Sequence, residues 1–450
     1  MAVRRNGLLG YKGDLEKTEK LRSTVEEKAR GELYSEQADD VTIMSTCKEI
    51  SQGDVLVGFH GYLEDTEAVP EKYIARLYRK HGKDLPQHLN GSFRLVLYDK
   101  SRKQLLATGD KVGKKVLYHT TGLDDFICSS HLTPLLRHEE IDGELDRQGL
   151  RDFLQSWSVS FSGGERLIDG IKRLRPSHTL IRSSEKSYIS KFWDVYDKSN
   201  DVSDSEAVRQ LDRLLTEAAE NLVKRVEDPI NVFLSGGFDS VFLATLISEV
   251  SDRNINTYTW GWQDQHFEDA EKMSNMLGTD QNSIRLDYGL PTKDDLWYYE
   301  EPQNAFVRYP FRELEQDHGM KSYWTGLNSQ ATFPVCLKNV RKLDRFDRFK
   351  NLAKFARKTG LNGVVGRKKY RLSKGVEVMG DPHHSAGAVN DWGLRNDQSR
   401  EMISGSLKKS TSDIRKKLDR NWELKDKSYQ ENYSYLQLRS RDTARYAYYA

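Results

Sequence analysis

Six residues near the middle of the chain, Ser-Gly-Gly-Phe-Asp-Ser at 235–240, combine the groups that a phosphate site needs. Gly236 and Gly237 lack Cβ atoms and allow positive φ, so backbone N–H groups can point at one anion. The two serine hydroxyls can donate to the same oxygens. Because a carboxylate beside phosphates is repulsive without a cation between them, Asp239 indicates Mg²⁺. The motif predicts a phosphate-binding loop rather than a plain glycine turn.

The stretches on either side of this loop predict the elements that position it. An apolar, β-branched run at 230–234 predicts a strand, the glycine-free run at about 241–250 predicts a helix, and 257–261 predicts a second strand. A strand–helix–strand alternation with a wholly apolar first strand is typical of a parallel, doubly wound sheet. Ligands of such sheets bind at the carboxyl ends of the strands, which is where the loop lies.

The N-terminal half has a different pattern. Residues 1–195 contain short apolar or alternating stretches bounded by Gly, Asn and Asp, which predict strands and turns, and one helical period at 70–82 interrupts them. The polar stretch at 196–203 has no periodicity and predicts a linker, and the residues from Ser203 to Ser205 are candidate N-caps for the helix that follows. We therefore expect two domains, at 1–195 and 204–450.

Composition limits the class of protein. The 450 residues are 37% hydrophobic and 31% charged with a formal net charge of +2, which indicates a globular chain of two or more domains. Cys47, Cys128 and Cys336 lie far apart without a CxxC pair, which argues against a disulfide framework and a structural zinc. No apolar run reaches the length of a membrane span or a signal peptide. These features predict a cytoplasmic protein.

One segment is strongly basic. Residues 338–374 carry 14 Lys and Arg against two Asp. Runs of this kind are usually solvated faces, so nucleic-acid binding through this segment is the less favoured interpretation.

Longer motifs show a family resemblance. SGGxDS resembles the pyrophosphate loop of the ATP pyrophosphatases, which cleave ATP between the α and β phosphates. Five segments before it are similar, in the same order, to segments of the glutaminase domain of B-type asparagine synthetases: FHGYLED, HLNGSFRLVLYD, LLATGDKVGKKVLYH, FICSSHLTPLL and LIDGIKRLRPSHTLI. The chain therefore resembles the asparagine synthetase family from about residue 50 to 330.

This resemblance implies a fold and ligands. The implied fold is an α+β layered N-terminal domain, of the N-terminal-nucleophile-hydrolase type, followed by an α/β doubly wound parallel-sheet domain of the adenine nucleotide alpha hydrolase type that is shortened at its C-terminus. The implied cofactors are ATP and Mg²⁺, with Asp239 holding the metal. The residues implied for ATP and pyrophosphate are Leu234, Ser235, Gly236, Gly237, Asp239, Ser240, Trp260, Thr325 and Gly326. A core position is an equal alternative for Trp260.

The N-terminal half departs from the family pattern. The family uses an N-terminal cysteine as nucleophile, whereas this chain begins Met-Ala-Val. The Asn-Gly-Glu that holds glutamine is replaced by His60, Gly61 and Tyr62, and only Asp110 is retained. We expect a vestigial glutamine site without glutaminase activity.

The second half departs as well. An Asp-Glu pair that helps to hold magnesium in the family falls on Gln330 and Ala331. Glu300 or Glu301 could replace those carboxylates, or they could belong to a solvated helix end.

Three functions follow from these observations. The first is an asparagine-synthase-like ligase that adenylates a small-molecule or peptide carboxylate and then forms an amide with ammonia or an amine. The alternatives are a catalytically degenerate nucleotide-binding or scaffold homologue and an RNA-modifying ATP pyrophosphatase. The resemblance leaves a homodimer open.

Overall fold

The computed structural model describes the greater part of the first 285 residues and short pieces after them. The described residues are 7–29, 31–66, 69–147, 149–150, 167–183, 186–194, 202–261, 264–285, 292–294, 300, 314–316, 318–320 and 322–326. The chain divides into two compact units, one made of 1–144, 168–327 and 443–450 and the other of 145–167 and 328–442. Almost all described residues belong to the first unit.

Two six-stranded antiparallel sheets form the N-terminal part. The first has the order β10-β8-β9-β1-β3-β2 and the second the order β12-β11-β7-β6-β5-β4. The strands of the first sheet are β1 (Leu8–Lys12), β2 (Tyr34–Ala38), β3 (Val41–Ser45), β8 (Tyr118–Thr120), β9 (Phe126–Ser129) and β10 (Ile171–Arg173). Those of the second are β4 (Ser51–Gln52), β5 (Val55–Leu63), β6 (Gly91–Asp99), β7 (Gln104–Gly109), β11 (His178–Arg182) and β12 (Ser187–Lys191).

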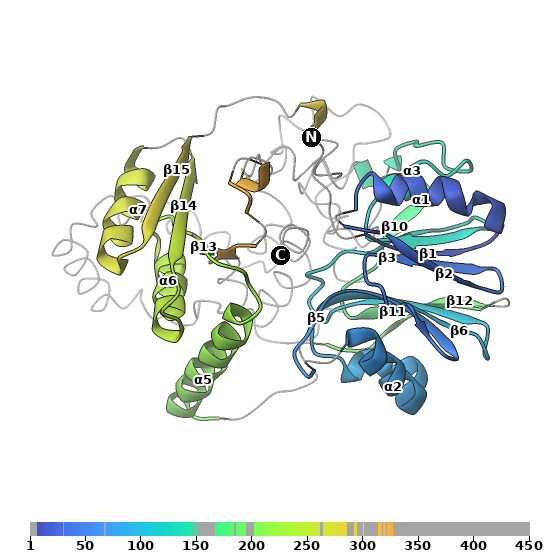
Figure 1. The fold of residues 1–450 in the computed structure, drawn as a ribbon, viewed down its shortest axis with the longest axis horizontal. Helices are drawn as coiled ribbons and strands as arrows, with labels where there is room; N and C mark the ends of the chain where they lie inside the picture. The colour runs from blue at the N-terminus through green and yellow to red at the C-terminus, as the bar shows by residue number, and fades with distance from the viewer. Residues whose placement is uncertain are drawn as a thin grey trace, which may run out of the picture. The chain divides into compact units, whose positions relative to one another are not determined.

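The two sheets stack face to face, and helices cover their outer faces (Figure 1). Alternate side chains of a strand point to opposite faces, so Leu8 packs between the sheets while Leu9 packs under the helices. The covering helices on the first sheet are α1 (Thr18–Glu26), preceded by the 3-10 turn η1 (Leu15–Lys17), and α3 (Thr133–Leu136). Those on the second are α2 (Pro70–His81) and the 3-10 helix η2 (Gly82–His88). These four layers, which we call the sandwich, agree with the expected layered α+β domain.

The predicted helix at 70–82 is α2. Pro70 occupies its first turn, where the missing N–H costs no hydrogen bond, and Gly82 follows its last residue with a positive φ of 58°. Ile74 and Tyr78 are buried against the second sheet. The helix thus begins and ends where its sequence provides the start and stop residues.

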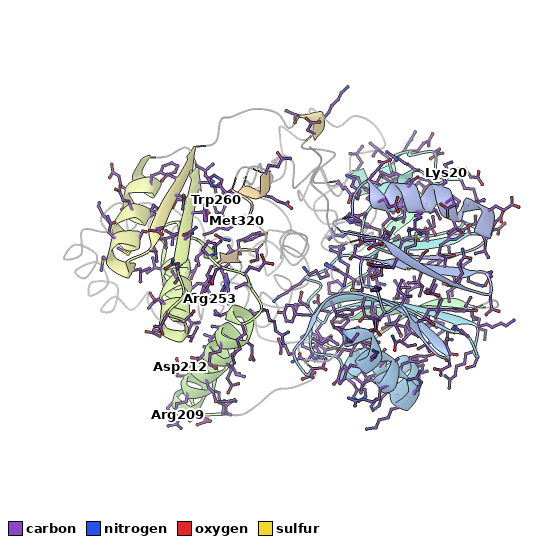
Figure 2. All side chains as sticks on the ribbon, in the orientation of Figure 1. Lys20, Arg209, Asp212, Arg253, Trp260 and Met320 are labelled. Atoms are coloured by element: carbon purple, nitrogen blue, oxygen red, sulfur yellow. The ribbon has the colours of Figure 1, made fainter. Side chains whose placement is uncertain are left out.

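The helix α5 (Asp204–Val223) begins where the sequence predicts. The Ser203 hydroxyl accepts a hydrogen bond from the Glu206 N–H at 3.3 Å, as an N-cap does. At the other end, the Arg253 side chain donates to the Val223 carbonyl oxygen at 2.6 Å; Figure 2 labels Arg253. This contact ties the end of α5 to the loop before β14 (Ile255–Gly261).

A parallel four-stranded sheet follows α5, with the order β15-β14-β13-β16. Its other strands are β13 (Ile230–Phe233), β15 (Asp280–Arg285) and β16 (Trp324–Thr325), and the helices α6 (Phe238–Val250) and α7 (Asp264–Leu277) connect β13 to β14 and β14 to β15. Residues of α5, α6 and α7 share one apolar cluster with β13 and β14. The predicted parallel sheet is therefore confirmed, and its doubly wound character stays a prediction.

The helices of the described part of the chain include none that is long and apolar enough to cross a membrane. The exact domain limits at 195 and 204 and the shortened C-terminus stay predictions.

Candidate functional site

The loop at 235–237 lies at a point where the order of the parallel sheet reverses. The chain passes from β13 through β14 to β15 on one side, and then returns to place β16 on the other side of β13. All pairings are parallel, so the carboxyl ends of β13 and β16 lie at the same edge. Ligands of open α/β sheets bind at such a switch point, because the connecting segments there separate and leave a crevice.

Hydrogen bonds within the loop hold its serines together. The Ser240 hydroxyl lies 3.1 Å from the Ser235 hydroxyl, accepts the Ser235 N–H at 3.2 Å and donates to the Gly237 carbonyl oxygen at 3.0 Å. Ser235 and Gly237 are exposed, and the first turn of α6 begins directly after them. The N-terminal end of a helix of this length adds partial positive charge beside the exposed loop, which suits an anion.

Two glycines let neighbouring segments approach this loop closely. Gly236 has a φ of 69°, and a Cβ atom there would lie 2.7 Å from the Cβ atom of Asp269 in α7. A Cβ atom on Gly326 would lie 2.8 Å from the carbonyl carbon of Asp239 and 2.9 Å from the backbone nitrogen of Ser240. The end of β16 therefore touches the start of α6, and the structure brings Gly326 to the loop as the sequence predicted.

Thr325 also lies at this edge, because it pairs with Phe233 across β13 and β16. Asp269 is a residue that sequence reasoning missed. It lies in the middle of α7, where an acidic residue is unremarkable, and only the packing of α7 against Gly236 places it beside the loop.

Asp239 is the half-buried carboxylate in the first turn of α6. Mg²⁺ prefers one or two carboxylates and completes its shell with phosphate oxygens and water, so this residue fits as a single protein ligand. Gln330 and Ala331 lie outside the described residues. Within the described part of the chain, Asp239 belongs to no group of three metal-ligating side chains.

Glu300 is not a solvated helix end, and its carboxylate is not available to a metal in this structure. Its two oxygens contact Lys28, His131 and Thr133 of the sandwich. These partners already provide the charge and hydrogen bonds that a buried carboxylate needs. The expectation that Glu300 replaces the missing carboxylates is therefore wrong for this conformation, and Glu301 lies outside the described residues.

Leu234 and Trp260, two of the residues implied for ATP, both make contacts within the sheet. Leu234 is buried, and its N–H donates to the Tyr258 carbonyl oxygen at 2.9 Å. Trp260, labelled in Figure 2, is half-buried and meets Phe233 edge to face with ring centroids 4.4 Å apart. A stacking role for Trp260 stays a prediction.

Three of the residues predicted to form a vestigial glutamine site, His60, Gly61 and Tyr62, lie on β5 of the sandwich. Gly61 has a φ of 127°, and a Cβ atom there would lie 2.1 Å from the Ser92 carbonyl oxygen. Burial, followed by the charges of Arg94 and Lys115, lowers the pKa of His60 well below its usual value. The Tyr62 ring lies under the Arg225 guanidinium at 5.3 Å, and burial raises the pKa of Tyr62 to about 12. A neutral imidazole and a neutral phenol thus stand where the family has an amide and a carboxylate.

Asp110 holds the turn that follows β7. Its carboxylate oxygens accept the backbone N–H groups of Val112 at 3.1 Å, Lys114 at 3.0 Å and Lys115 at 3.2 Å. The side chain is buried, and burial raises the pKa of Asp110. These bonds give the retained aspartate a structural role in its own turn.

The described cysteines lack the environment of a nucleophile. Cys128 is buried and Cys47 is half-buried, and neither forms a disulfide. Burial raises the pKa of each thiol to about 12, with the charge of Glu71 adding to the effect on Cys47. A thiol that stays protonated at neutral pH is a poor nucleophile, which agrees with the expected structural role.

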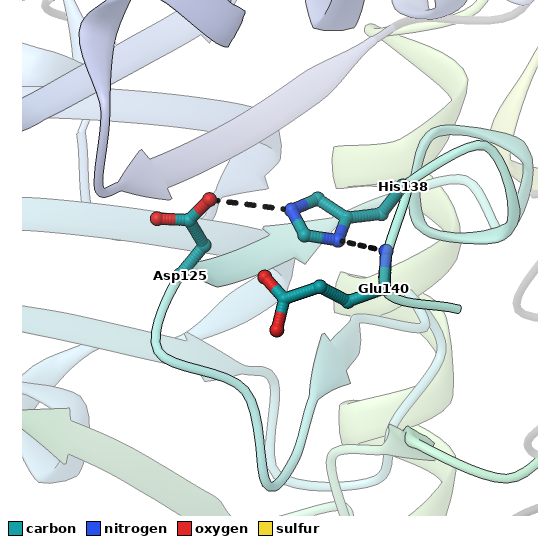
Figure 3. Close-up of side chains that lie close together, drawn as sticks. All are labelled: Asp125, His138 and Glu140. Atoms are coloured by element: carbon teal, nitrogen blue, oxygen red, sulfur yellow. Dashed lines mark hydrogen bonds and ion pairs between the residues drawn. The ribbon is translucent and has the colours of Figure 1, made fainter.

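A cluster of Asp125, His138 and Glu140 in the sandwich offers three metal-type ligands (Figure 3). The Glu140 N–H donates to His138 Nδ1 at 3.3 Å, and His138 Nε2 lies 3.4 Å from an Asp125 oxygen. The same Asp125 oxygen accepts the Lys17 ammonium at 2.8 Å. Since a lysine already neutralises the carboxylate, we interpret the cluster as an ion-pair network that joins β9, α3 and η1.

The basic segment at 338–374 lies outside the described residues, so nucleic-acid binding there stays a prediction.

Comparison with known proteins finds two domain models that match different parts of this chain. Residues 64–193 match the model of the glutamine amidotransferase domain, and residues 210–319 match that of asparagine synthase. An asparagine synthetase (glutamine-hydrolysing) of Bacillus subtilis is 26% identical over 287 residues, which cover 60% of this chain and 41% of the relative. The chain is therefore similar, at modest identity, to glutamine-hydrolysing asparagine synthetases.

Other relatives extend this result. Amidase chry2 of Gibberella zeae is 27% identical over 58% of this chain and 42% of the relative, and a putative asparagine synthetase of Methanocaldococcus jannaschii is 22% identical over 74% and 71%. The match thus spans about two fifths of the Gibberella and Bacillus relatives. The solved glutamine phosphoribosylpyrophosphate amidotransferase of B. subtilis has a TM-score of 0.26 and 12% identity, over 72% of this chain and 85% of that chain, a similarity too low to support an argument.

Proposed function

We propose that this chain is an ATP-dependent amide-forming ligase of the asparagine synthase type that lacks glutaminase activity. The observation that carries the proposal is the loop at 235–240, which lies at the switch point of a parallel sheet with Gly326 packed against it. That loop lies inside the segment that matches asparagine synthase. The family uses ATP, and its named members make or hydrolyse amides.

The loop residues would bind the triphosphate. The backbone N–H of Gly236, the exposed Ser235 hydroxyl and the N-terminal end of α6 would contact the β and γ phosphates, and the Gly237 N–H, which donates to the Ser235 hydroxyl at 3.4 Å, would exchange that bond for a phosphate oxygen. Leu234 and Trp260 would contact the adenine. Asp239 would hold Mg²⁺, which supplies charge neutralisation for the departing pyrophosphate when bound.

The reaction would have two steps. An oxygen of a substrate carboxylate attacks the α phosphorus, the bond to the β-phosphate oxygen breaks, and pyrophosphate leaves. Ammonia or an amine then attacks the carbonyl carbon of the acyl adenylate, loses a proton and displaces AMP. The protein's share of this chemistry is to hold both reactants in line and to stabilise charge that develops on the phosphates.

The nitrogen would come from free ammonia or from a substrate amine. His60 and Tyr62 replace the groups that hold glutamine, and the oxygens of Asp110 are bonded within their own turn. The thiols of Cys47 and Cys128 have raised pKa values and lie inside the sandwich. These features support an amidotransferase-like domain that has lost its chemistry.

One assay tests the proposal. AMP and pyrophosphate release would be measured with Mg-ATP, aspartate and ammonium for the unmodified chain and for Asp239→Ala. We expect release from the unmodified chain and a loss of about 100-fold or more in the variant. Equal background release from both proteins, with ATP binding retained, would contradict the ligase and favour a nucleotide-binding scaffold.

A further inference from the structure

The carboxylate of Glu300 is buried in the sandwich, although Glu300 lies more than 160 residues after the sandwich residues that it contacts through hydrogen bonds. The side chain of Glu300 is 3% exposed, and those of Lys28 and His131 are 4% and 2% exposed. One oxygen accepts the Thr133 N–H at 3.2 Å and the Thr133 hydroxyl at 2.6 Å and lies 3.7 Å from the Lys28 ammonium. The other accepts the Leu132 N–H at 3.3 Å and lies 3.4 Å from His131 Nδ1.

These partners come from two elements of the sandwich that are fixed independently of Glu300. Lys28 follows α1, and its N–H donates to the Val25 carbonyl oxygen at 3.0 Å. The segment before α3 is fixed by Ser129, whose hydroxyl accepts the His131 N–H at 3.1 Å, and by Ser130, whose hydroxyl accepts the Leu8 N–H at 3.0 Å. The backbone of these donors is therefore held by hydrogen bonds that do not involve Glu300.

The chemistry of the donor set selects a carboxylate. Two consecutive backbone N–H groups and one hydroxyl match its two oxygens, and the Lys28 ammonium supplies the opposite charge. Although burial disfavours the charged form, His131 and Lys28 hold the pKa of Glu300 well below its usual range. A neutral amide of the same size would accept fewer of these bonds and would not satisfy Lys28.

We propose that Lys28, His131, Leu132 and Thr133 form a carboxylate receptor of the sandwich, and that Glu300 is its resident ligand. Occupation of this receptor ties the segment between β15 and β16 to the amidotransferase-like domain. The proposal goes beyond the proposed ligase function and does not depend on ATP turnover.

Hydrogen exchange of the Leu132 and Thr133 amides tests the receptor. Glu300 has a φ of 54°, which glycine adopts without strain, so Glu300→Gly removes the carboxylate without a backbone penalty. We expect these amides to exchange about tenfold faster or more in this variant than in the unmodified chain. Peptides from β5 and β6 should exchange at unchanged rates, which shows that the sandwich remains folded.

Rescue by a free ligand makes the test specific. Acetate added to Glu300→Gly should restore the slow exchange in a saturable manner, whereas sodium chloride at equal ionic strength should not. Acetate should fail in the double variant with Lys28→Met. Unchanged exchange in Glu300→Gly, or equal rescue by chloride, would overturn the receptor.

Two further variants complete the design. Glu300→Gln keeps the side-chain volume and should also speed exchange, so it replaces Glu300→Gly if the glycine variant does not fold. Glu217→Ala, which removes an exposed carboxylate paired with Arg213 at 2.8 Å, should leave exchange unchanged. Since no readout involves ATP, the receptor and the ligase can fail separately.

Discussion

At the scale of single residues, Ser240 is the centre of the phosphate loop. Its hydroxyl contacts both the Ser235 N–H and the Ser235 hydroxyl, and it is the buried member of that pair. Ser240 thus fixes the loop from the first turn of α6. Ser235 is the exposed member of the pair and is accessible to a ligand.

Replacing Ser240 by alanine tests this role. We expect Ser240→Ala to weaken ATP binding about tenfold and to lower the free energy of unfolding by about 1 kcal/mol, because a buried hydrogen-bonding centre is lost. Calorimetric titration with ATP and urea denaturation measure the two effects. Ser248→Ala removes a hydroxyl from the same helix that bonds only to the Thr245 carbonyl oxygen, at 2.7 Å, and should leave ATP affinity unchanged. Equal losses in both variants would contradict a specific role for Ser240.

Gly326 is the second residue on which the site depends. A methyl group there would collide with backbone atoms of Asp239 and Ser240, which cannot rotate away. Gly326→Ala should therefore lower the free energy of unfolding by about 1–3 kcal/mol and abolish measurable ATP binding, as β16 moves away from α6.

The control for this variant is Gly122→Ala. Gly122 also lacks a side chain, but open space surrounds it and only its φ of 79° opposes alanine. We expect this variant to lose about 1 kcal/mol of stability and to keep its ATP affinity. Normal ATP binding by Gly326→Ala would show that β16 does not contribute to the site.

At the scale of elements, the end of β6 is joined to α2 by one buried carboxylate. Asp99 accepts the Tyr78 hydroxyl of α2 at 2.9 Å, the Ser101 hydroxyl at 2.6 Å and the Arg102 guanidinium at 2.7 Å. Burial opposes the charged form, but these hydrogen bonds outweigh it and lower the pKa of Asp99 from 3.8 to about 2. The turn after β6 and the packing of α2 therefore both depend on an ionised Asp99.

This shift predicts a pH dependence. Because the pKa is lower in the folded protein than in the unfolded chain, Asp99 stabilises the fold fully above about pH 4, and its contribution is lost as the pH falls towards 2. The contribution is about 2 kcal/mol at neutral pH. Asp99→Asn should remove it and flatten the stability curve between pH 4 and 2, measured by urea denaturation. Asp84 is exposed, so Asp84→Asn should show the same dependence of stability on pH as the unmodified chain. The same dependence in Asp99→Asn would contradict a stabilising role for the ionised Asp99.

At the scale of the whole molecule, a part that matches the glutamine amidotransferase domain and a part that matches asparagine synthase are joined in one chain. The absence of a working glutamine site in the first part stays a prediction. Tyr62 lies beside Arg225, which follows α5.

This division predicts which nitrogen donor supports the reaction. With Mg-ATP and aspartate, ammonium should support pyrophosphate release, whereas glutamine should support none, and no glutamate should form. An enzymatic assay for glutamate measures the second outcome directly. Glutamate formation from glutamine by both the purified chain and the Asp239→Ala variant, and not by the buffer, would show that the sandwich is still a glutaminase.

The sequence by itself determined the local features. The strand at β13, the glycine loop, the helix α6 and the start of α5 at Ser203 follow from apolar runs, glycines and caps that act within a few residues. The order of motifs along the chain also indicated the family. Local patterns carry this information because hydrogen-bond periodicity and turn chemistry involve residues that are close in sequence.

Only the tertiary structure decided which distant residues meet. It placed Asp269 beside Gly236, Gly326 against Asp239, and Glu300 among donors more than 160 residues away, where the sequence suggested a metal ligand or a solvated helix end. It also showed that the Asp110 carboxylate accepts hydrogen bonds from backbone N–H groups of the turn that follows it. These contacts depend on strand order and on the packing of helices on a sheet. Neither produces a local pattern of residues that can be recognised in the sequence.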